Sequence, residues 1–89
     1  MPKEYFEIKR FIEAANDELG ACERRLTSDR TALAELRKIL PLDEDESKYP
    51  VLTELAAEIR ETEARVNELL SKRSKWYREI SRMLPAPVI

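Results

Sequence analysis

Apolar residues recur at alternating spacings of three and four along most of this chain, in two separate runs. This is the heptad pattern of a helix that packs one narrow stripe against another helix. The two runs are nearly equal in length, and one short segment with two prolines and four consecutive acids separates them. The pattern therefore predicts an all-α fold in which two long helices form an antiparallel coiled-coil hairpin.

The heptad positions are named the seam. In the first run they are Tyr5, Ile8, Ile12, Ala15, Leu19, Cys22, Leu26, Asp29, Leu33, Leu36 and Leu40, and in the second Leu52, Leu55, Ile59, Thr62, Val66, Leu69, Arg73, Trp76, Ile80 and Met83. Two of these residues, Asp29 and Arg73, carry a charge. A charge in a seam is costly unless it is paired, and polar seam residues commonly set helix register and oligomeric state. We therefore expect Asp29 and Arg73 to set the register.

The 89 residues are predicted to form a single domain, 1–89. Prolines near the start of the first run and after each run indicate where the helices begin and end. The expected elements are a helix at about 3–40, an acidic turn at about 41–49, a helix at about 50–84 and an extended tail at 85–89.

Two places in the first run contain residues that disfavour a continuous helix. Gly20 is a poor helix former, and the cluster Thr27-Ser28-Asp29 contains three residue types that favour helix N-caps. The heptad phase nevertheless continues unchanged past both places, which favours one continuous helix. At the turn, Ser47 is the expected N-cap of the second helix, with Pro50 in its first turn.

The apolar surface is wider than the seam. Large apolar residues flank it on both helices, and a flanking row indicates a second contact face. The candidate partner-binding residues are Phe6, Phe11, Ile39, Leu70, Tyr77 and Leu84. We expect the hairpin to assemble into a homodimeric four-helix bundle or to bind a different protein. The expected function is that of a non-catalytic protein–protein interaction module, such as a coiled-coil adaptor, a chaperone or a small inhibitor.

Composition argues against catalysis. The chain has no histidine, one cysteine and one glycine, so it lacks an imidazole base, a zinc cluster of several cysteines and a glycine-rich phosphate loop. We therefore predict no catalytic, cofactor-binding or metal-binding residues, and we do not expect an enzyme.

The predicted turn carries the consecutive acids Asp43, Glu44, Asp45 and Glu46. In arrangement, a helical hairpin with an acidic tip resembles the Gre-type transcription factors, whose coiled-coil finger enters the secondary channel of RNA polymerase. The resemblance covers the hairpin and the acidity of its tip, and no tip motif matches residue by residue. It implies an alternative function, that of an effector which inserts its acidic tip into a basic channel of a large enzyme such as RNA polymerase.

A second alternative is nucleic-acid contact through the basic end of the second helix, which carries Lys72, Arg73, Lys75, Arg78 and Arg82. Acidic residues of the first helix are expected at the same end and would offset this positive field, so nucleic acid is not the expected partner. The net charge is −2, and no signal peptide or membrane-spanning segment is recognisable. The expected location is cytoplasmic, away from membranes.

Overall fold

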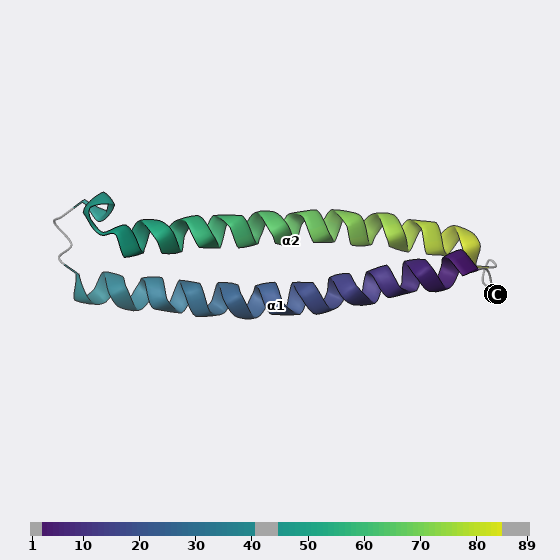
Figure 1. The fold of residues 1–89 in the computed structure, drawn as a ribbon, viewed down its shortest axis with the longest axis horizontal. Coiled ribbons are helices and arrows are strands. Elements are labelled where there is room, and N and C mark those ends of the chain that lie inside the picture. The colour runs from purple at the N-terminus through teal and green to yellow at the C-terminus, as the bar shows by residue number, and fades with distance from the viewer. Residues whose placement is uncertain (1–2, 41–44, 85–89) are drawn as a thin grey trace, which may run out of the picture.

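A computed structural model describes residues 3–40 and 45–84, which form a hairpin of two long helices (Figure 1). Helix α1 spans Lys3–Ile39, a 3₁₀ turn η1 spans Glu46–Lys48, and helix α2 spans Pro50–Met83. The two helices lie side by side and antiparallel, so the beginning of α1 meets the end of α2. The predicted all-α helical hairpin is confirmed.

Helix α1 is continuous through both places where a break was conceivable. The Thr27 hydroxyl donates a hydrogen bond to the Glu23 carbonyl, with an oxygen–oxygen distance of 3.0 Å. A threonine that bonds back to the preceding turn is part of a running helix and does not cap a new one. Gly20 also lies within the helix, and its backbone φ is not positive. The predicted continuity is confirmed.

The turn differs from the prediction in its capping. The Asp45 carboxylate accepts a hydrogen bond from the backbone N–H of Ser47 at 3.0 Å, and this bond begins η1. Tyr49 occupies the N-cap position of α2, without a side-chain capping bond, and Pro50 follows in the first turn. The prediction of Ser47 as the N-cap of α2 is therefore wrong, because Ser47 lies within η1, where its backbone N–H donates to the Asp45 carboxylate. Residues 41–44 and the predicted tail at 85–89 lie outside the described residues.

The seam forms the core, since every seam residue is buried or half-buried. Its centre is a cluster of Ala15, Leu19 and Leu69, against which Cys22, Val66 and Trp76 pack. Thr62 is a buried polar seam residue, and its hydroxyl donates to the Glu58 carbonyl at 2.9 Å. Two helices enclose only a thin interior, and no large side chain among the described residues is completely removed from solvent.

Candidate functional site

Polar contacts between α1 and α2 define two opposite sides of the hairpin. On the first side, Arg25 pairs with Glu58 at 3.0 Å, and Arg65 pairs with Glu18 through both carboxylate oxygens. Arg65 also pairs with Glu68 on its own helix, at 3.1 Å. The hydrogen bond from Arg65 holds the pKa of the Glu18 carboxyl below its ordinary value. This side is therefore lined by ion pairs along its middle.

On the second side, Arg30 pairs with Glu63 at 2.8 Å. Nearer the beginning of α1, the guanidinium of Arg73 donates to the side-chain oxygen of Asn16 at 2.9 Å. The same guanidinium lies 5.9 Å from the centre of the Tyr77 ring, a distance at which a cation attracts an aromatic face. The charged seam residue Arg73 thus leaves the seam toward this side and links the two helices.

The six predicted partner-binding residues are all exposed, with between 39% and 76% of their surface accessible. They are Phe6, Phe11, Ile39, Leu70, Tyr77 and Leu84. Val51 is similarly exposed, and the sequence analysis did not single it out.

The structure does not bring these six residues into one row. Residues seven apart on a coiled-coil helix share a side. Phe11 lies seven residues before Glu18 and is therefore on the first side, whereas Leu70 lies seven residues after Glu63 and is on the second. Phe11 and Ile39 of α1 thus lie on the first side, as does Val51, seven residues before Glu58, whereas Leu70, Tyr77 and Leu84 lie on the second.

On the first side, Phe11 and Ile39 are too far apart to act together. They are 28 residues apart in the sequence, or about 42 Å along the helix, and the ion pairs of Glu18 and Arg25 lie between them. The Phe11 ring also lies 5.6 Å from the Trp76 ring, measured between centroids, so part of its surface already contacts α2. The first side carries separate apolar residues and no continuous patch.

On the second side, Leu70 and Tyr77 of α2 and Leu84, the C-cap residue directly after α2, follow one another at seven-residue spacing. We name these three residues the α2 row. Lys9 lies seven residues before Asn16 and is therefore on this side, and Phe6, three residues before Lys9, lies toward its outer edge. The beginning of α1 lies next to the end of α2 (Figure 1). Its ring makes an edge-to-face contact with Tyr5, with the centroids 5.3 Å apart. The second side therefore carries three exposed apolar residues at heptad spacing together with Phe6.

The other predicted register residue, Asp29, is half-buried in the seam. Its carboxylate oxygen Oδ2 is buried and has no hydrogen-bond partner, and it is the only such side-chain atom in the described parts of the chain. A buried polar atom without a partner destabilises the fold. The Arg73 guanidinium leaves the seam and contacts Asn16 and Tyr77, whereas the Asp29 carboxylate keeps one buried oxygen without a hydrogen-bond partner.

Of the four candidate tip acids, Asp43 and Glu44 lie outside the described residues. Glu46 accepts hydrogen bonds from Arg37 at 2.8 and 3.2 Å, which ties the turn to the end of α1. The Asp45 carboxylate accepts from the backbone N–H of Ser47, and this bond holds the pKa of Asp45 below its ordinary value. Both described tip acids therefore take part in the local structure of the turn.

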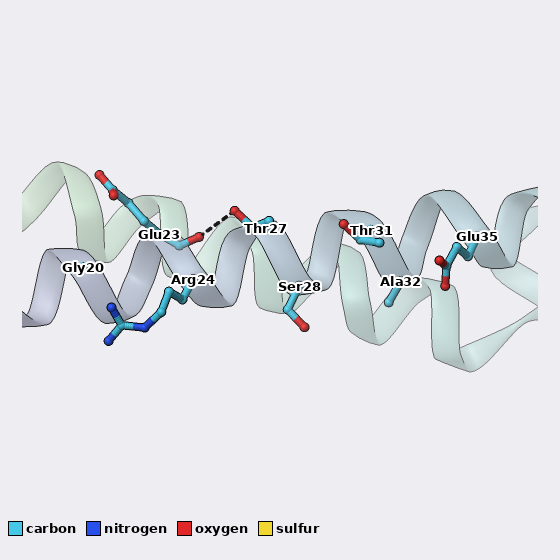
Figure 2. A pocket seen from close by; sticks show the side chains of 8 residues that line it. All are labelled: Gly20, Glu23, Arg24, Thr27, Ser28, Thr31, Ala32 and Glu35. Atoms are coloured by element: carbon cyan, nitrogen blue, oxygen red, sulfur yellow. Dashed lines mark hydrogen bonds between the residues drawn. The ribbon is translucent and has the colours of Figure 1, made fainter.

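A shallow hollow lies on the outer face of α1, and every residue that lines it belongs to that helix (Figure 2). Its lining is Gly20, Glu23, Arg24, Thr27, Ser28, Thr31, Ala32 and Glu35. The side chains are spread along the helix and do not converge on one point. The hollow reflects the small size of several of these residues and presents no arrangement of groups suited to a small ligand.

Within 3–40 and 45–84, no group of three or more His, Cys, Asp or Glu residues is placed to hold a metal ion. Neither helix has, over its described length, an apolar stretch long enough to cross a membrane. Comparison with protein-family models, curated proteins and solved structures finds no significant match. Functional inference for this chain therefore rests on its surface.

Proposed function

We propose that this chain is a non-catalytic protein–protein interaction module that binds its partner through the α2 row, with Phe6 at the edge of the contact. The observation that carries the proposal is the exposure of Leu70, Tyr77 and Leu84 at heptad spacing on one side of α2. Heptad-spaced apolar residues are the usual means by which one helix binds another. The seam already occupies the other apolar stripe of α2, so the row is available to a further helix.

The orientation of Tyr77 supports this proposal. The Arg73 guanidinium lies over its ring and is itself held by Asn16. A tyrosine held in this way loses little conformational freedom when it binds, which favours aromatic residues as anchors of protein interfaces.

Site-specific photo-cross-linking in living cells tests this proposal. A benzophenone amino acid would replace Tyr77 in one variant, Leu70 in a second and Thr31 in a third, which is the control. Thr31 is exposed on the outer face of α1, in the hollow of Figure 2. We expect protein adducts, with this chain itself or with another protein, at positions 77 and 70 and none at 31. If neither row position gave adducts, or if the control gave as many, the proposed function would be wrong.

A further inference from the structure

Two serines complete the α2 row into a second heptad stripe. Ser74 and Ser81 lie between the three large residues, so that residues 70, 74, 77, 81 and 84 follow at spacings of four and three. All five are exposed. The Ser81 hydroxyl donates a hydrogen bond to the Tyr77 carbonyl at 2.9 Å, so its proton already has an acceptor within the same helix. We name these five residues the outer stripe.

The outer stripe reads the same from either end, as Leu, Ser, Tyr, Ser, Leu. In a two-fold symmetric interface each contact occurs twice with the two copies exchanged, so a stripe with this residue order pairs like residues with like. In an antiparallel pairing around Tyr77, Leu70 would face Leu84 of the partner subunit, and Ser74 would face Ser81 of the partner subunit. The large residues would meet at the centre and ends, and the serines would let the helices approach closely between them.

From these observations we propose that the occupant of the α2 row is a second copy of this chain. The two α2 helices pack antiparallel along the outer stripe, with Tyr77 near the two-fold axis and the α1 helices on the outside. This inference rests on the proposed function and names its partner.

The charges beside the stripe predict how the dimer responds to salt. Arg78 follows Tyr77 directly, so in this arrangement it approaches Arg78 of the partner subunit near the axis. Like charges repel, and added salt screens the repulsion between exposed groups. Apolar contact must then hold the dimer together, and the dissociation constant is expected to fall or stay constant as sodium chloride is raised. An interface built on charge attraction would respond in the opposite direction.

Disulfide trapping tests the geometry on the full chain carrying Cys22→Ala, which removes the native thiol. Ser74→Cys and Ser81→Cys change one atom each, and their equimolar mixture should form a disulfide-linked heterodimer under mild oxidation. Each variant alone should form less disulfide-linked dimer. In the antiparallel pairing, the two copies of position 74, or of position 81, are offset by about six to eight residues along the helix axis, or roughly 9 to 12 Å. Ser28→Cys, on the outer face of α1, is the matched control (Figure 2).

Sedimentation equilibrium of the unmodified chain completes the test. We expect a monomer–dimer equilibrium that the double change Leu70→Ser and Leu84→Ser weakens at least tenfold without loss of helix, since both residues are exposed. A chain that stays monomeric, or a cysteine mixture that cross-links no better than Ser28→Cys, overturns the inference. If adducts with another protein still formed at position 77, the proposed function would stand and only the identity of the partner would be wrong.

Discussion

The substitution Asp29→Leu should stabilise the hairpin. Asp29 occupies a seam position between apolar neighbours along the heptad, and its buried Oδ2 atom has no hydrogen-bond partner. Leucine restores the apolar pattern at a position that is half-buried in the native fold. The same change removes one of the two charged seam residues, so some selectivity for a single register is expected to be lost.

The size of the effect follows from two contributions. A buried polar atom left without a partner costs about 1 to 3 kcal/mol, and the substitution removes that cost. Full burial of a leucine side chain is worth about 1.5 to 3 kcal/mol, and a half-buried position provides roughly half of that. Together they predict an increase of about 2 to 4 kcal/mol in the free energy of unfolding.

Urea denaturation followed by far-ultraviolet circular dichroism measures this change, with all variants at one protein concentration. The control is Glu35→Leu, which introduces the same side chain on the exposed outer face of α1 and should change stability by less than about 0.5 kcal/mol. The reasoning is refuted if Asp29→Leu unfolds at the same or a lower urea concentration than the unmodified chain. A gain no larger than that of the control would refute it equally.

Two further predictions concern the seam and its ion pairs. Leu69 is 3% exposed and lies in the core cluster, so Leu69→Ala should cost about 2 to 5 kcal/mol in urea denaturation, whereas Leu33→Ala should cost less because Leu33 is only half-buried. Hydrogen bonds from Arg65 and Lys72 lower the pKa of Glu18 and of Glu68 respectively. A lowered folded-state pKa gives stability above the ordinary value of 4.5 that is lost as the pH falls through the folded value. The melting temperature should therefore decrease on acidification below that pH, and Glu18→Gln combined with Glu68→Gln should reduce the decrease; an unchanged acid dependence would contradict this assignment.

The helices and the core were predictable because they depend on periodicity within each helix. An unbroken heptad phase predicted both the continuous α1 and the burial of the seam residues. The capping of the turn was not predictable in the same way. Asp45 and Ser47 are both good capping residues, and which of them acts depends on the local path of the backbone.

The arrangement of the candidate surface depends on which flanks of the two helices are adjacent, and the sequence analysis treated the six residues as one row although it predicted the antiparallel direction. Exposure of the six flanking residues follows from their distance from the seam, but the side on which each one lies follows from the direction of the second helix. In an antiparallel pair, contacts such as Arg30 with Glu63 reveal which flanks are adjacent. Pairing of oppositely charged residues along the flanks is the signal that would have separated Phe11 from Tyr77 before the structure was known.

The ion pairs of the first side also limit how the two helices can slide past each other. If α2 moved by one heptad in one direction, Arg25 would face Arg65, and in the other direction Glu18 would face Glu58. Each slip brings one pair of like charges together, although in the first direction Glu18 would also face Lys72, which is attractive. The apolar residues make the helices associate, and the order of charges beside them favours the observed alignment, even though each pair is partly exposed and adds little stability by itself.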